Sequence, residues 1–178
     1  MSKYKEKVEK ILSKLNIYKA PIPIIDIANY YGFIVVEAML ENDESGFLMI
    51  DKDGTSINGE KRHKIICINH TDSPLRKRFT IAHELGHFFL EIEGKNNIEN
   101  FIVHREFAEK VDKQKEREAD SFASELLVPT SFLEKELSKL TEADLIFFDV
   151  PYYISKYFQV SRTCAEIRYE QYKRGKNE

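Results

Sequence analysis

Two kinds of hydrophobic pattern alternate along the chain. Apolar residues recur at helical spacing, or follow helix-capping residues, in 4–15, 24–31, 116–127, 132–140, 152–158 and 162–172. A run rich in β-branched residues predicts a strand at 33–38, and the apolar runs at 45–51 and 64–69 predict two more. The second and third strands should pair antiparallel because their connection is short. The order of elements predicts an α+β fold, with a small antiparallel sheet and a helical C-terminal half.

Turn and capping residues indicate where these elements begin and end. Asp53-Gly54 predicts the turn that follows the second strand. Thr130-Ser131 predicts the cap of one C-terminal helix, and Asp149-Val150-Pro151 predicts the start of the next. After the third strand, Ser73 followed by Pro74 predicts a further helix, and Gly94 supplies its stop.

The helix that begins after Ser73 carries the sequence H-E-x-x-H at positions 83–87. Residues i and i+4 lie about one turn apart on the same face, so His83 and His87 can direct ring nitrogens at one point. Such a point suits Zn²⁺, with Zn–N distances of roughly 2.0–2.1 Å. Glu84 is poorly placed as a third ligand but well placed to take a proton from an attacking water.

A chance pair of surface histidines is the alternative interpretation. Against it, both histidines fall on one buried stripe that also contains the small residues Ala82 and Gly86, which would let another element approach closely. The other three histidines, His63, His70 and His104, show no ligand spacing and are predicted to lie on the surface.

A catalytic zinc site needs a third protein ligand. The motif H-E-x-x-H-x-x-G-x-x-H is absent, which directs attention to the acids of the helix over 116–127. With about 100° per residue, Glu116 faces inward with the alanines, and Glu118 falls about 200° away on the solvent face, beside Glu125. Asp120, one turn beyond Glu116, could accept a hydrogen bond from a ligand histidine. Alternatively, Glu116 and Asp120 merely complement the helix dipole.

Composition narrows the class of protein. The chain has 178 residues, of which 42% are hydrophobic, so we expect a single domain over 1–178. A net charge of −3 argues against direct DNA binding. No membrane-length apolar run or signal-peptide core is visible, so we expect a cytoplasmic protein. Cys67 and Cys164 are expected to be reduced thiols in the core.

Two motifs together resemble those of the ImmA/IrrE family of metallo-endopeptidases. The first is Arg76-x-Arg78-Phe79-Thr80-x-Ala82-His83-Glu84-Leu85-Gly86-His87, and the second is E-x-E-A-D-x-F-A-x-E-L-L-V-P over 116–129. The resemblance covers roughly residues 20–170. Asp120 stands where many members of the family have Asn, and it can serve the same hydrogen bond.

The resemblance implies a zincin-like, gluzincin-type fold. It implies that His83, His87 and Glu116 bind Zn²⁺ and that Glu84 is the catalytic base. It further implies cleavage of a helix-turn-helix transcriptional repressor, often encoded beside the peptidase. The length of the chain favours the compact antirepressor type of phages and integrative elements.

Two segments are predicted to have accessory roles. Residues 150–172 resemble a helix-turn-helix, which we interpret as a C-terminal appendage that packs or docks a protein substrate rather than contacting DNA. The polar segment 93–113 is expected to be a loop that limits access to the site. The group that stabilises the oxyanion stays open among Tyr152, Tyr153 and Arg168.

The sequence therefore predicts a zinc-dependent endopeptidase acting on a repressor. The rival interpretation is a metal-binding regulator that sequesters a repressor without cutting it, or acts as a DNA-linked stress regulator.

Overall fold

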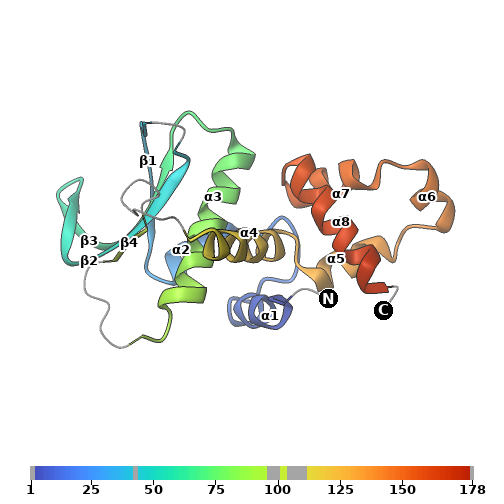
Figure 1. Cartoon of the computed structure of the whole chain (residues 1–178), viewed down its shortest axis with the longest axis horizontal. Helices are drawn as coiled ribbons and strands as arrows, with labels where there is room; N and C mark the ends of the chain where they lie inside the picture. The colour runs from blue at the N-terminus through green and yellow to red at the C-terminus, as the bar shows by residue number, and fades with distance from the viewer. Residues whose placement is uncertain (1–2, 42–43, 96–100, 104–111, 177–178) are drawn as a thin grey trace. The chain divides into compact units, whose positions relative to one another are not determined.

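The computed structural model describes residues 3–41, 44–95, 101–103 and 112–176 (Figure 1). The chain divides into two compact units, one formed by residues 24–123 and the other by residues 1–23 with 124–178. The single domain expected over 1–178 stays a prediction. Within the part of the chain that the structure describes, no helix combines the length and apolar character that a membrane crossing requires.

The unit over 24–123 contains a four-stranded sheet in the order β1-β3-β2-β4. Its strands are β1 (Ile34–Ala38), β2 (Gly46–Ile57), β3 (Glu60–Asn69) and β4 (Phe101–Val103). β2 pairs antiparallel with β3 and with β4, as predicted for the first of these pairs. β1, however, pairs parallel with β3.

The expected antiparallel sheet is therefore wrong, and the sheet is mixed. Residues 65–69 of β3 are all buried, as suits a strand with a neighbour on each side. β1 lies at the β3 edge of the hairpin and runs in the same direction as β3. The pattern of residues within a strand does not determine which edge of a hairpin an earlier strand joins, because that depends on tertiary packing.

The hairpin between β2 and β3 turns later than the sequence analysis predicts. β2 continues past Asp53-Gly54 to Ile57, and the chain reverses at Asn58 and Gly59, whose φ angles are 51° and 81°. Asn-Gly suits this turn because both positions need a positive φ. Gly54, with φ 78°, lies instead where the pairing register shifts between Ile50 and Thr55. It marks an irregularity within the strand.

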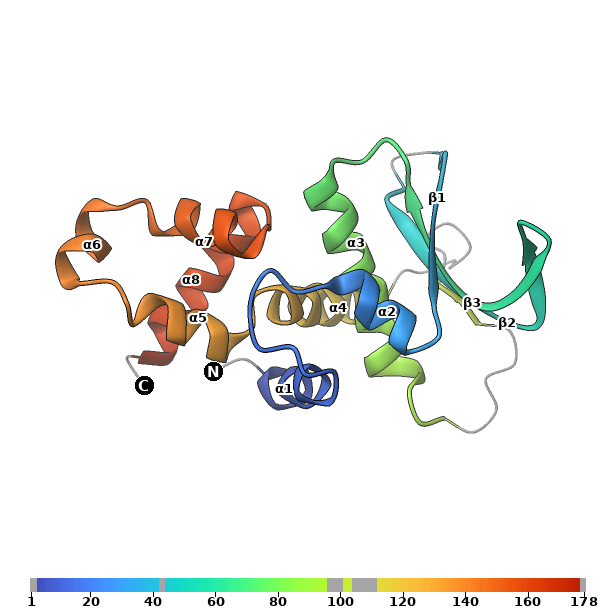
Figure 2. The same ribbon diagram turned by 180° about the vertical axis from the view of Figure 1, so that it is seen from behind.

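Two helices cover one face of this sheet, α2 (Ile24–Tyr30) and α3 (Pro74–His87), and they contact each other (Figure 2). Ser73 caps α3 through a hydrogen bond from the Arg76 N–H to Ser73 Oγ, and Pro74 occupies the first turn, as predicted. A Cβ on Gly46 would lie 2.6 Å from Thr80 Cγ2 of α3. The glycine thus lets the sheet approach the helix closely.

Aromatic rings fix the far end of α3. A π-helical turn, η1 (Phe88–Ile92), continues the helix, and Gly94 with φ 84° follows it, in keeping with the expected stop. The ring centroids of Phe88 and Phe33 lie 5.0 Å apart, and those of Phe89 and Tyr31 lie 4.8 Å apart. The access loop predicted over 93–113 falls largely on residues 96–100 and 104–111, as does His104, and these lie outside the described residues.

The other unit is helical. It contains α1 (Lys5–Lys14), the end of α4 (Lys113–Leu127), α5 (Thr130–Leu137), α6 (Glu142–Phe147), α7 (Val150–Phe158) and α8 (Arg162–Lys176). The sequence analysis missed α6, although Thr141 and Asp144 form a reciprocal capping box at its start. The cap expected at Thr130-Ser131 is also wrong, because α5 begins at Thr130.

Thr130 is instead part of a buried polar cluster around Arg168 and Glu125. Arg168 is 3% exposed and Glu125 is 1% exposed, so the solvent-facing position expected for Glu125 is wrong. Arg168 Nη2 lies 2.8 Å from Glu125 Oε2, and Arg168 also donates from Nε and Nη2 to the Val128 carbonyl. The Thr130 N–H donates to Glu125 Oε1 at 2.7 Å. This cluster joins the end of α4 to the start of α5 and to α8.

Replacing Arg168 by Met should destabilise the protein by about 3–5 kcal/mol, because Glu125 would stay buried without its cation. Chemical denaturation followed by circular dichroism measures the loss. Arg162→Met on the same helix is the matched control, since Arg162 makes exposed ion pairs with Asp149 and Glu166, and its effect should be far smaller. Equal losses in the two variants would contradict the role of the buried cluster.

Candidate metal centre

The two histidines of the H-E-x-x-H sequence lie side by side on the buried face of α3. His83 is 4% exposed and His87 is 2% exposed. Their Nε2 atoms are 3.1 Å apart, which confirms that spacing of four residues directs both rings at one point. His63 and His70 are exposed, as predicted.

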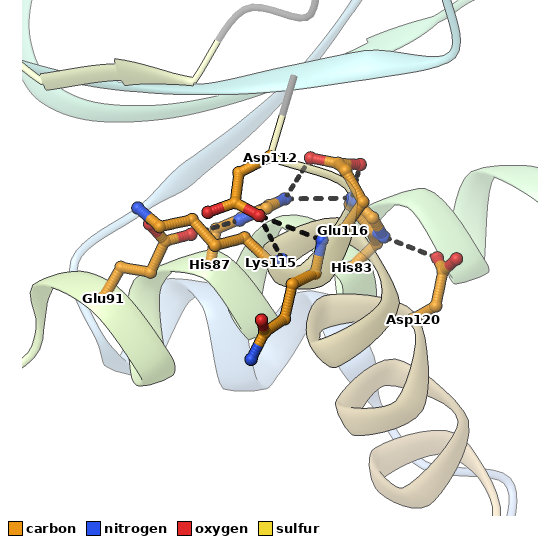
Figure 3. A network of polar contacts seen from close by, with 8 residues as sticks. His83, His87, Glu91, Asp112, Lys115, Glu116 and Asp120 are labelled. Carbon is orange, nitrogen blue, oxygen red and sulfur yellow. Dashed lines mark hydrogen bonds and ion pairs between the residues drawn. The ribbon is translucent and has the colours of Figure 1, made fainter. Parts of the chain in front are cut away.

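Glu116 meets these rings from the first turn of α4 (Figure 3). Glu116 Oε2 lies 3.3 Å from His83 Nε2, and Glu116 Oε1 lies 3.2 Å from His87 Nε2. Among the described residues, His83, His87 and Glu116 form a group whose ligand atoms lie within 4.8 Å of one another and could hold a metal ion. The helical-angle argument selects the same glutamate.

A glycine makes this meeting of α3 and α4 possible. A Cβ added to Gly86 would lie 3.1 Å from both the Cα and the carbonyl oxygen of Ala119. Any larger residue at position 86 would therefore press on the backbone of α4, one turn from Glu116. The expectation that small residues on the histidine stripe admit a second element is confirmed at Gly86.

Each histidine is also held on its other ring nitrogen by a carboxylate. His83 Nδ1 lies 2.8 Å from Asp120 Oδ1, as the sequence analysis expects for Asp120. His87 Nδ1 lies 2.6 Å from Glu91 Oε1. The sequence analysis missed Glu91, although its position four residues after His87 was a usable signal. Carboxylates at Nδ1 are the usual partners of metal-binding histidines, because they fix the tautomer and the ring orientation.

The carboxylates make the site favour positive charge. Burial alone would lower the pKa of His83, but hydrogen bonds with Asp120 and Glu116 outweigh it and raise that pKa to about 9. Burial likewise opposes a raised pKa at His87, and contacts with Glu116 and Glu91 outweigh it. The two rings in turn hold the pKa of Glu116 well below its usual range. A metal ion binds the unprotonated ring, so protons and a metal ion compete here.

Glu84 completes the set of predicted residues. It is 4% exposed on α3, and its negative charge contributes to the raised pKa of both His83 and His87. The carboxylate is therefore near enough to both rings to influence their charge.

The three side chains considered as groups that stabilise the oxyanion either make other contacts or are exposed. Tyr153 donates its hydroxyl to Glu136, Arg168 is bound within the buried cluster of the helical unit, and Tyr152 is 52% exposed. All three belong to the unit of residues 1–23 and 124–178, whereas the metal-binding group lies in residues 24–123.

Two imidazole nitrogens and one carboxylate are a donor set that fits a catalytic metal ion with a position left for water or substrate. Together with the H-E-x-x-H helix, this donor set is typical of metal-dependent peptidases. The profile of the peptidase M78 family, described as the IrrE N-terminal-like domain, matches residues 30–170. The chain belongs to this family, which confirms the predicted resemblance.

Comparison with solved structures supports the fold. The chain is similar to a Mycobacterium tuberculosis transcriptional regulator, with a TM-score of 0.58 and 13% identity. The match covers 93% of this chain and 45% of that protein, so the chain spans less than half of its length. A likeness at this identity bears on the fold alone. The search of curated proteins finds no match.

Replacing Gly86 by Ala should destabilise the protein by about 1–3 kcal/mol, because the new methyl group presses on the α4 backbone. The loss should appear although Ala is favoured over Gly within a helix by about 1 kcal/mol. Chemical denaturation measures it, with Arg117→Ala at an exposed position of α4 as the control. A Gly86→Ala variant more stable than the original protein would show that the close crossing is unimportant.

Proposed function

We propose that the chain is a zinc-dependent endopeptidase with a zincin-like fold of the gluzincin type. His83, His87 and Glu116 bind the metal, and Glu84 is the catalytic base. The observation that carries this proposal is the convergence of both Nε2 atoms and the Glu116 carboxylate at 3.1–3.3 Å from two separate helices. Membership of the peptidase M78 family supports the reaction class.

The chemistry needs a Lewis acid and a base. A bound zinc ion supplies the Lewis acid, which polarises the scissile carbonyl and makes water more acidic. Glu84 takes a proton from the attacking water and passes it to the amine that leaves. Asp120 and Glu91 hold the two imidazole rings through Nδ1, and this leaves Nε2 of each ring for the metal.

The proposed substrate is a helix-turn-helix transcriptional repressor, so that the peptidase acts as an antirepressor in the cytoplasm. The family resemblance supports this choice. Direct contact with DNA is disfavoured by the net charge of −3 of the whole chain. The helix-turn-helix resemblance of 150–172 therefore suits a packing or docking role.

The purified protein should contain close to one zinc ion per chain by elemental analysis. His83→Ala and Glu116→Ala should lose it, because two remaining protein ligands rarely hold zinc tightly. Glu118→Ala is the matched control on α4, since Glu118 lies about 200° round the helix from Glu116 and should leave the zinc content unchanged. Normal zinc in both ligand variants would refute the site, and zinc loss in Glu118→Ala would show that the wrong glutamate was chosen.

Glu84→Gln should separate proteolysis from sequestration. The amide keeps the size of the side chain and removes the proton acceptor, so the variant should fold, hold zinc and bind the repressor. Cleavage of the repressor encoded beside this chain's gene should fall by roughly 10²–10⁴-fold or more. Gel electrophoresis of the repressor, with and without a chelator, measures the cut.

A reporter assay in cells measures whether Glu84→Gln still relieves repression. If Glu84→Gln relieves repression as well as the original protein does, cleavage is not the mechanism. The chain would then be a metal-binding regulator that sequesters its repressor.

A further inference from the structure

Glu91 lies in the π-helical turn that directly follows the metal-binding helix. α3 ends at His87, and η1 over Phe88–Ile92 closes with a hydrogen bond of 2.9 Å from the Glu93 N–H to the Phe88 carbonyl. A π-helical turn changes the direction in which the following side chains point, and such turns are frequent at functional sites. The backbone therefore departs from α-helical geometry where Glu91 faces His87.

Both carboxylate oxygens of Glu91 are engaged (Figure 3). Oε1 lies 2.6 Å from His87 Nδ1, and Oε2 forms an ion pair with Lys115 Nζ at 2.5 Å. The Glu91 side chain is 16% exposed, compared with 55% for Asp120, which contacts the other histidine. Glu91 is thus the more enclosed of the two carboxylates at Nδ1, and it also has a cationic partner, Lys115.

Lys115 connects this carboxylate to the helix that carries the third ligand. It directly precedes Glu116 in the first turn of α4, where Asp112 Oδ1 accepts hydrogen bonds from the Gln114 and Lys115 N–H groups. The ion pair of Lys115 with Glu91 therefore ties the start of α4 to η1. This ion pair therefore links the residue that contacts the His87 ring to the residue that precedes Glu116.

We propose that Glu91 is a positioning residue for His87 and that Lys115 holds Glu91 in place. The inference rests on the proposed metal site but assigns two residues outside the ligand group. Glu91 accepts the Nδ1–H of His87, which fixes the ring plane and leaves Nε2 facing Glu116 and His83. Lys115 holds the Glu91 carboxylate from the α4 side, so the two helices keep their register at the site.

Zinc affinity tests the proposal directly. Zn²⁺ is titrated in competition with a chromophoric chelator against the original protein, Glu91→Ala, Glu91→Gln and Lys115→Met. Glu91→Ala should bind zinc roughly 10- to 100-fold more weakly. Glu91→Gln should lose less affinity than Glu91→Ala, because its amide oxygen can still accept from Nδ1, although the ion pair with Lys115 is lost. Lys115→Met should also lose less affinity than Glu91→Ala, because the carboxylate at Nδ1 is kept, and Glu93→Gln, an exposed position just after η1, should bind as the original protein does.

The visible spectrum of Co²⁺-loaded protein reports ligand geometry separately from affinity. The d–d bands should shift in Glu91→Ala and return in Glu91→Gln, which a general loss of stability would not produce. Thermal unfolding of the metal-free variants shows whether each one folds. Should Glu91→Ala fail to fold, the comparison of Lys115→Met with the original protein still tests whether Lys115 holds Glu91 in place.

The outcomes distinguish this inference from the proposed function. An original protein that binds no zinc would overturn the metal site itself. If the original protein and Glu91→Ala bind zinc equally well with the same Co²⁺ spectrum, the metal site stands and the positioning role is overturned. A Glu91→Gln variant that binds zinc as weakly as Glu91→Ala would overturn the role of the hydrogen bond. A Lys115→Met variant with unchanged zinc affinity would overturn the role of Lys115 in holding Glu91.

Discussion

The close crossing of α3 and α4 at Gly86 is the constraint on which the candidate metal centre depends. A Cβ at this position would lie 3.1 Å from the Ala119 backbone, and the carboxylate oxygens of Glu116 lie only 3.2–3.3 Å from the ring nitrogens. Functional geometry of this kind tolerates displacements of about 0.5 Å. Gly86, which has no functional group, is therefore needed for the Glu116 carboxylate to reach the two histidine rings.

The second requirement is a balance of charge around two buried rings. Buried polar groups are costly unless they are paired, and here each histidine nitrogen faces a partner. Glu116 lies at both Nε2 atoms, while Asp120 and Glu91 lie at Nδ1 of His83 and His87. The excess of carboxylates raises the pKa of both rings, which is an electrostatic preference for a cation. The field that attracts a proton also attracts a metal ion, so the two compete for the rings.

The sequence predicts those parts of this arrangement that follow from spacing within one helix. The shared face of His83 and His87 and the inward angle of Glu116 need only the period of the α-helix. The sequence analysis overlooked Glu91, although residues four apart on a helix face each other and Glu91 follows His87 at that spacing. The parallel pairing of β1 was not predicted, because the edge of a hairpin that a strand joins depends on the whole sheet. The Asn58-Gly59 turn had a clear local signal, which the earlier Asp53-Gly54 obscured.

The acids of α4 show why spacing alone does not assign a role. Glu116 and Glu125 are both largely or wholly enclosed, yet one faces two imidazoles and the other faces the Arg168 guanidinium with the Thr130 N–H. The angle along the helix placed Glu125 on the solvent side, because the arrival of α8 cannot be read from α4 itself. On this helix, an enclosed glutamate is a candidate ligand where imidazole nitrogens that can bind a metal face it, as they face Glu116. Where a guanidinium and a backbone N–H face it instead, the same side chain anchors one helix to another.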